Sequence, residues 1–288
     1  MKRLIICLIA VMALSAVLAG ALHAEDNKVT LVYVEWDCAA SSTNLVAAVL
    51  QEKMGYEVEM LPVANAAMWQ SLATGDADGM VTAWLPGTHA DLLAGVEDDV
   101  ENLGQIVGGA RIGWAVPAYV TINSIEEVNA HAAEFNNQII GIDPGAGLMK
   151  LSEQVLVDYE LADMTLVEGS DVMMTTALGD AIDNEQWIIV TAWSPHWKFA
   201  KWELKYLEDP KGVLGEEEYI GTIVRKGLNE DMPDVYTLLD NFHYEDASQL
   251  GMLMGWNAEE GADRYENALR FMEENPELVE SWLEGIEM

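Results

Sequence analysis

The chain has 288 residues and a formal net charge of −35, from 49 acidic and 14 basic residues. Nucleic acids and anionic lipid surfaces are therefore excluded as partners, because both are bound through basic patches that displace counterions. The length suits two domains of about 100 to 150 residues each, with an acidic surface that favours solubility.

The N-terminus has the pattern of a secretory signal peptide. Lys2 and Arg3 precede an apolar run over residues 4–19, and Ala21-Leu22-His23-Ala24 ends in the small residues that a signal peptidase reads. We expect residues 1–24 to be cleaved near Ala24 and the mature chain to reach the periplasm; an uncleaved anchor is the alternative. No later stretch has the roughly 18 apolar residues of a membrane span, so no membrane insertion is expected after cleavage.

Cys38 is the single cysteine of the predicted mature chain, because Cys7 lies in the signal. No intramolecular disulfide is possible. Cys38 stands beside Ala39 and Ala40 with no histidine nearby in sequence to activate it, which indicates a packed thiol rather than a nucleophile.

Strand and helix patterns alternate twice in the same β-α-β-α-β order. The first copy has strands at 29–35, 56–61 and 80–84 and helices at 45–53 and 66–73, the first helix following the candidate caps Ser41, Ser42, Thr43 and Asn44. The second copy has strands at 138–142, 164–167 and 187–193 and helices at 148–158 and 171–180. This alternation predicts two α/β lobes, each a mostly parallel sheet flanked by helices.

Two apolar strand patterns, 112–120 and 219–225, are candidates for the segments that cross between the lobes and form a hinge. Beyond them the chain is largely helical and is expected to pack on the first lobe, with helices at 232–241, 246–254, 261–273 and 277–282. The predicted division is residues 25–117 plus 221–288 for lobe 1 and 118–220 for lobe 2.

A six-residue run occurs twice with a single change, as Val81-Thr82-Ala83-Trp84-Leu85-Pro86 and Val190-Thr191-Ala192-Trp193-Ser194-Pro195. Each run is typical of a buried strand that proline ends, with an indole at its carboxyl end, where ligands bind in open α/β sheets. Trp36 similarly ends the first predicted strand. We therefore expect Trp36, Trp84 and Trp193 at one interlobe cleft. The remaining tryptophans are expected to pack in the interior: Trp69, Trp114, Trp187, Trp197, Trp202, Trp256 and Trp282.

Three indoles suit a quaternary ammonium, which has no N–H donors and is held by the negative faces of aromatic rings. The turn Gly145-Ala146-Gly147-Leu148 opens a predicted helix, and its backbone N–H groups could bind a carboxylate. A simple tight turn would explain the glycines equally well. His89, five residues after Trp84, is either structural or in contact with ligand.

These features resemble the extracytoplasmic glycine betaine binding proteins that serve ABC importers. The resemblance is carried by Val34-Glu35-Trp36-Asp37, Met68-Trp69-Gln70, Ala83-Trp84-Leu85-Pro86 with Thr88-His89, Gly141 to Met149, Trp193-Ser194-Pro195-His196-Trp197, Leu207-Glu208-Asp209-Pro210 and Arg225-Lys226-Gly227. It covers nearly the whole mature chain. The resemblance implies a two-lobed type II periplasmic-binding-protein fold with the ligand in the interlobe cleft. It differs from the family at Leu148, where isoleucine is frequent, and at Cys38.

Carried over position by position, the resemblance implies that Trp36, Trp84 and Trp193 form the ammonium box. Gly147 and Leu148 correspond to the backbone donors and His89 to a side-chain donor for the ligand carboxylate. The implied function is capture of glycine betaine and delivery to a membrane permease. Choline, carnitine, proline betaine and dimethylsulfoniopropionate remain alternatives, because the sequence does not fix the pocket volume.

Other classes of function fit the residues less well. The chain has no Gly-x-Ser-x-Gly elbow and no metal-ligand cluster with suitable spacing, so an exported hydrolase is disfavoured, and no enzyme activity, cofactor or metal is expected. An adhesion module would share the acidic exported scaffold but has no need of a duplicated strand-end tryptophan.

Overall fold

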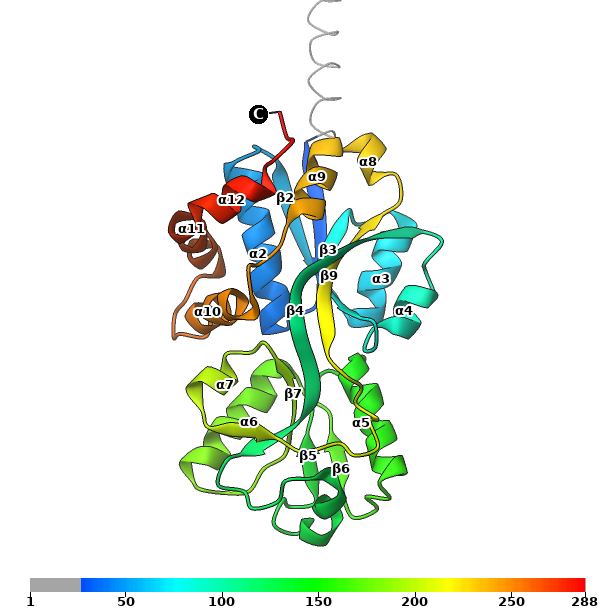
Figure 1. Cartoon of the computed structure of the whole chain (residues 1–288), viewed down its shortest axis with the longest axis vertical. Coiled ribbons are helices and arrows are strands. Elements are labelled where there is room, and N and C mark those ends of the chain that lie inside the picture. The colour runs from blue at the N-terminus through cyan, green and yellow to red at the C-terminus, as the bar shows by residue number, and fades with distance from the viewer. Residues whose placement is uncertain (1–26, 288) are drawn as a thin grey trace, which may run out of the picture.

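The computed structural model describes residues 27–287, and the predicted signal peptide lies outside them. Its strands follow the order β2-β1-β3-β9-β4-β7-β5-β6, with β8 paired to β4. Figure 1 shows an elongated molecule with two halves that are joined by the long strands β4 and β9. Within residues 27–287, no helix combines the length and apolarity that crossing a membrane requires.

The first half begins with the predicted β-α-β-α-β unit. Its elements are β1 (Lys28–Tyr33), α2 (Asp37–Glu52), β2 (Glu57–Pro62), α3 (Asn65–Thr74), β3 (Gly79–Leu85) and α4 (Ala90–Ala94). β1 pairs in parallel with both β2 and β3. Every residue of β3 is buried, as expected for a central strand with helices on both faces.

Helix α2 begins at Asp37, eight residues before the predicted start. The candidate caps Ser41 to Asn44 lie inside the helix and are buried. Three of the four have other partners: Asn44 Nδ2 donates to the Ala40 carbonyl, and the hydroxyls of Ser41 and Ser42 bond to Asn257 and Tyr244. The capping interpretation was wrong because tertiary partners satisfy side chains that otherwise favour helix ends. Trp36 consequently stands at the N-cap of α2 and not on β1, which ends at Tyr33.

The long strand β4 (Val100–Pro117) connects the two sheets. Its first part pairs with β9 (Glu218–Arg225) and its second part, from Arg111 to Ala115, pairs with β7, both antiparallel. The prediction of a strand at 112–120 found only the second part, because the first contains glycines and register shifts that weaken the strand pattern. The lobe boundaries at 117/118 and 220/221 stay predictions, since β4 runs unbroken from one sheet into the other.

The second half repeats the alternation. Its elements are η1 (Ile125–His131), β5 (Gln138–Ile140), α5 (Gly147–Asp158), β6 (Thr165–Val167), α6 (Asp171–Asp183), β7 (Val190–Ser194), α7 (Lys198–Lys201) and β8 (Leu204–Tyr206). β5 pairs in parallel with β6 and β7. The predicted strand at 187–193 starts later, at Val190, and Trp187 instead packs against His131 and Phe135.

The C-terminal helices belong to the first half (Figure 1). They are α8 (Leu228–Asp231), α9 (Pro233–Asn241), α10 (Ala247–Asn257), α11 (Arg264–Glu274) and α12 (Pro276–Trp282). α10 and α11 pack on α2, which also contacts β1, β2 and β3. α2 is therefore enclosed by the sheet and the C-terminal helices, and its run of buried residues from Cys38 to Leu50 follows from this position.

Candidate ligand-binding site

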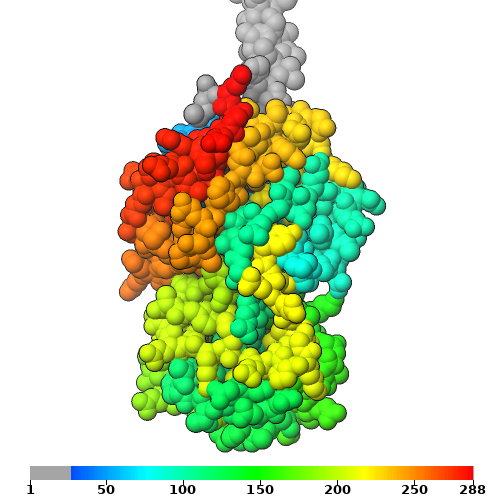
Figure 2. All heavy atoms as spheres, in the orientation of Figure 1, coloured from blue at the N-terminus to red at the C-terminus, as the bar shows by residue number. Residues whose placement is uncertain are grey.

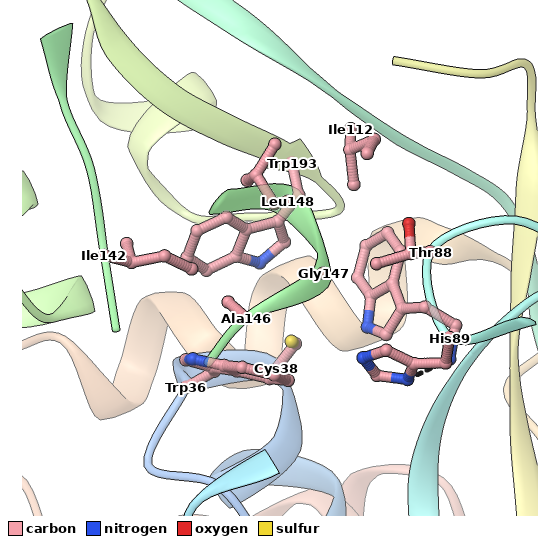
Figure 3. Close-up of a pocket in the computed structure, with 11 residues that line it drawn as sticks. Trp36, Cys38, Thr88, His89, Ile112, Ile142, Ala146, Gly147, Leu148 and Trp193 are labelled. Carbon is pink, nitrogen blue, oxygen red and sulfur yellow. Dashed lines mark hydrogen bonds between the residues drawn. The ribbon is translucent and has the colours of Figure 1, made fainter. Parts of the chain in front are cut away.

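A small cavity lies between the two halves, which meet across the middle of the molecule (Figure 2). Its empty space, part of which is open to solvent, amounts to about 320 Å³. The lining residues are Trp36, Cys38, Trp84, Thr88, His89, Ile112, Ile142, Ala146, Gly147, Leu148 and Trp193 (Figure 3). All six residues singled out as candidate binding residues are among them.

The three expected tryptophans come from different elements. Trp36 is at the N-cap of α2 and Trp84 is on β3, both in the first half, whereas Trp193 is on β7 in the second half. Each is only 4 to 5% exposed. The two copies of the repeated run thus end at the same cavity from opposite sides, and both carry a cis bond before proline.

His89 is buried beside two indoles. Its ring stacks on Trp36 with centroids 6.1 Å apart and meets the Trp69 ring edge-on at 5.7 Å. The backbone N–H of Trp84 donates to His89 Nδ1 at 3.1 Å. Burial lowers the pKa of His89 to about 3, so the ring is neutral at physiological pH. Because Nδ1 accepts, the single proton is on Nε2, where it is available as a donor.

The segment before His89 is held by the first residue of β9. Glu218 accepts hydrogen bonds from the Thr88 backbone N–H at 2.6 Å and from the Thr88 hydroxyl at 2.8 Å. A strand that joins the two halves therefore also fixes the loop that carries a cavity residue.

Gly147 and Leu148 occupy the first turn of α5, after an N-cap residue, Ala146, that has no side-chain cap. Their backbone N–H groups have no hydrogen-bond partner within residues 27–287. Unpaired donors and the positive end of the helix dipole make this end of α5 suitable for a carboxylate. Gly147 also approaches the first half closely: a Cβ there would lie 2.4 Å from the Thr88 carbonyl oxygen.

Hydrogen bonds between the halves surround the cavity. Trp36 Nε1 donates to Asp143 Oδ2 at 3.1 Å, and Asn65 Nδ2 donates to the Gly145 carbonyl at 3.1 Å. The first of these bonds also fixes the plane of a cavity-lining indole. The structure thus has the two halves in direct contact over the cavity.

A buried polar network lies next to the cavity and also crosses between the halves. Trp197 Nε1 donates to Asp37 Oδ2 at 2.5 Å, and the Asp37 backbone N–H donates to Asp171 Oδ2 at 3.1 Å. His196 Nε2 lies 3.2 Å from Asp171 Oδ1. Sequence reasoning missed this network, because nothing local shows that residues 134 positions apart will meet.

The donor atoms of Asp37, Asp171 and His196 lie within 4.8 Å of one another, a spacing that could suit a metal ion. The hydrogen bonds argue against that use. His196 Nδ1 accepts from the Lys198 backbone N–H at 3.2 Å, so the proton is on Nε2, which points at Asp171. With both ring nitrogens engaged, His196 has no free lone pair to offer, and we interpret the group as a hydrogen-bond network.

Five cavity residues were not expected as binding residues: Cys38, Thr88, Ile112, Ile142 and Ala146. Ile112 pairs with Trp193 in the β4–β7 register, a tertiary relationship without a local signal. Cys38 and Thr88 are neighbours of predicted site residues and could have been found from that proximity. Burial raises the pKa of Cys38 to about 12, so the thiol stays protonated and has the packing role expected for it.

Two α/β halves joined by crossing strands around a shared cavity define a solute-binding protein of the type II periplasmic-binding-protein fold. Residues 27–274 match the family described as OpuAC, the substrate-binding domain of ABC-type glycine betaine transport systems. The chain belongs to this family, whose members bind betaine-type or choline ligands for ABC transporters.

Three relatives illustrate the similarity. The chain is 42% identical over 158 residues to the glycine betaine/carnitine transport binding protein GbuC of Listeria monocytogenes, an alignment that spans 54% of this chain and 51% of that protein. The chain therefore matches about half the length of this curated relative. Lactococcal OpuAC, in a closed conformation with glycine betaine, is 41% identical with a TM-score of 0.84, covering 90% of this chain and all of that one. ProX of Borrelia burgdorferi is 36% identical with a TM-score of 0.86, covering 90% and 97%.

A more distant solved structure, a choline binding protein in complex with choline, is 25% identical with a TM-score of 0.84 and covers 91% and 93% of the two chains. These relatives are substrate-binding proteins of transport systems and not enzymes.

Proposed function

We propose that this chain captures glycine betaine in the interlobe cavity and delivers it to an ABC importer. The observation that carries the proposal is one small cavity lined both by three indoles and by three N–H donors, of which those of Gly147 and Leu148 have no partner within residues 27–287. A ligand matching these walls has a methylated cation at one end and a carboxylate at the other.

The indoles of Trp36, Trp84 and Trp193 form the cation-binding wall. A trimethylammonium group cannot donate hydrogen bonds, and each contact with an aromatic face contributes about 0.5 to 2 kcal/mol. Trp193 comes from the other half, so the box is complete only when the halves meet.

The carboxylate would accept from the N–H groups of Gly147 and Leu148 at the start of α5 and from His89 Nε2. These donors favour betaines over choline, which has a hydroxyl in place of the carboxylate. The donors also come from both halves. A zwitterion therefore binds the closed arrangement more tightly than the open one, and this difference in affinity stabilises the closed arrangement.

The proposed biological role follows from the family. A closed, loaded protein outside the cytoplasm would be recognised by the membrane permease of an ABC importer, and residues 1–24 would serve as the export signal. The sequence of events contains no chemical step, so no turnover is expected with any betaine.

Calorimetric titration of the mature protein tests the proposal by comparing glycine betaine with two analogues that each lack one of its charged groups. Glycine betaine has both charged ends, choline lacks the carboxylate, and 3,3-dimethylbutanoate replaces the quaternary nitrogen with carbon. We expect glycine betaine to bind at least tenfold more tightly than either analogue. Equal affinities for glycine betaine and 3,3-dimethylbutanoate contradict the cation box.

The same titration with carnitine, proline betaine and dimethylsulfoniopropionate ranks the remaining ligands. Tighter binding of one of these would retain the site and replace glycine betaine as the preferred ligand. Absence of binding by every quaternary ammonium or sulfonium compound would overturn the proposed function.

A further inference from the structure

Lys198 is a fully buried lysine beside the cavity. It lies in the first turn of α7 with an exposed fraction of 0%, and its ammonium has no hydrogen-bond partner among the described residues. The Nζ atom lies 4.0 Å from the centroid of the Trp193 ring, close enough for a cation–π contact. Burying an ammonium without hydrogen bonds costs desolvation free energy, so we expect Lys198 to have a function at this position.

The ammonium and the cavity share one indole. Trp193 lines the cavity whereas Lys198 does not, so Lys198 covers part of the ring that the ligand does not reach. A ligand cation against the rest of the ring would meet an aromatic surface already polarised by a positive charge. At separations below about 10 Å, in a partly buried site, repulsion between two such charges changes affinity by about tenfold.

The charged groups near Lys198 are two carboxylates and, beyond one of them, a guanidinium. Asp171 of α6 and Asp37 of α2 are the nearby carboxylates, and Arg264 of α11 lies 3.7 Å from Asp37. Burial raises the pKa of Asp37, with a further contribution from Asp171. Burial alone would raise the pKa of Asp171 as well, but the hydrogen bond from His196, the charge of Lys198 and the hydrogen bond from the Asp37 backbone lower it.

The remaining neighbours of Lys198 are neutral at pH 7. Burial and the Lys198 charge lower the pKa of His196 to about 4, and burial keeps the Cys38 thiol protonated. Lys198 is therefore the cation that a ligand in the box meets across the Trp193 ring.

We propose that Lys198 is a specificity-determining residue that makes the tryptophan box select zwitterions against ligands with a net positive charge. The inference rests on the proposed function of the cavity. A choline-type ligand experiences only repulsion from the ammonium. A betaine carries its carboxylate toward the N-terminus of α5, and attraction between that carboxylate and Lys198 offsets much of the repulsion at its other end.

Lys198→Met tests this selection, because methionine matches the length of the buried stem without its charge. We expect calorimetry at pH 7 to show choline binding tightened by about tenfold and glycine betaine binding changed by less than about threefold. Affinity for 3,3-dimethylbutan-1-ol, the uncharged analogue of choline, should not change. Lys201→Met is the matched control, because Lys201 lies on the same helix over Trp202, with Nζ 4.8 Å from that ring and away from the cavity.

A second measurement needs no variant. Burial lowers the pKa of Lys198 to about 8, whereas His196 and Cys38 titrate outside the interval from pH 7 to 9.5. In the wild-type protein, the choline affinity relative to glycine betaine should therefore rise over that interval. An unchanged affinity ratio, in folded Lys198→Met or between the two pH values, overturns the inference while leaving the proposed function intact. Wild-type protein that binds neither ligand overturns both.

Discussion

The backbone N–H of Trp84 donates to His89 Nδ1 at 3.1 Å, which assigns the imidazole proton to Nε2. One hydrogen bond from the backbone of Trp84 thus sets the tautomer of the neighbouring histidine. Burial lowers the pKa of His89 to about 3, so in the proposed function His89 would meet the ligand carboxylate as a neutral N–H donor.

This neutral donor predicts the sign of the pH dependence of binding. If the bound state holds His89 neutral, protonation can only favour the free state, so the glycine betaine affinity should not rise as the pH falls. Calorimetry at pH 7.5 and pH 5 should show equal or weaker binding at the lower pH. Tighter binding at pH 5 would instead indicate an imidazolium that pairs with the carboxylate. His89→Gln keeps an N–H donor but cannot be protonated. Any weakening of binding at pH 5 that is due to His89 should therefore be absent in this variant.

If the three indoles form the box, removing an indole at the cavity should weaken ligand binding, and removing one elsewhere should not. Trp84→Ala and Trp193→Ala should each weaken glycine betaine binding at least tenfold, because each removes an aromatic face worth about 0.5 to 2 kcal/mol together with its packing. Trp256→Ala is the control, since Trp256 of α10 packs under Arg270 of α11, outside the cavity lining. Calorimetry on variants shown by circular dichroism to be folded makes the comparison. Unchanged affinity in either cavity variant contradicts the box.

Much of this site could be predicted from local signals. The repeated Val-Thr-Ala-Trp-x-Pro run marks two buried strands whose ends reach the same cavity, and the glycines before α5 mark a helix start with unpaired donors. These features depend on residues close together in sequence, so they can be predicted from residue propensity and hydrophobic periodicity.

Tertiary relationships had no such signal. Ser41 to Asn44 have the composition of helix caps, yet they lie inside α2, where the hydroxyls of Ser41 and Ser42 bond to the distant residues Asn257 and Tyr244. The first part of β4 carries Glu101, Asn102 and glycines and forms a strand only because β9 pairs with it. Similarly, no local pattern shows that the Lys198 ammonium will be buried over the Trp193 ring.

Close packing at Gly147 predicts a steric effect on closure. In Gly147→Ala the new Cβ would lie 2.4 Å from the Thr88 carbonyl oxygen and 2.7 Å from Thr88 Cγ2, so the halves cannot approach as closely. We expect the glycine betaine affinity to fall at least tenfold. The melting temperature of the ligand-free protein should change little, because the clash exists only between the halves.

Gly145→Ala is the control for this substitution, because it alters the same turn but a Cβ at Gly145 would meet nothing within 4 Å. The pair separates a clash with Thr88 from a general effect on the turn before α5. Equal losses of affinity in both variants would assign the effect to the turn itself.

Two polar contacts between the halves differ in burial and should differ in their effect on ligand binding. Asp37 accepts from Trp197 Nε1 at 2.5 Å with its side chain 21% exposed, whereas Asp91 and Lys150 form an ion pair whose side chains are 83% and 70% exposed. Exposed pairs contribute little because solvent screens them, but removing one partner of a buried hydrogen bond costs about 1 to 3 kcal/mol.

Asp37→Ala should therefore weaken glycine betaine binding by roughly 5- to 150-fold, whereas Asp91→Ala should change it by less than about threefold. Small-angle scattering with saturating ligand should show that Asp37→Ala still closes, since ligand binding can drive closure even where the closed state is less favourable. The loss in affinity then measures how much the buried contact stabilises the closed state. Equal effects in the two variants would mean that closure does not depend on the Asp37–Trp197 contact.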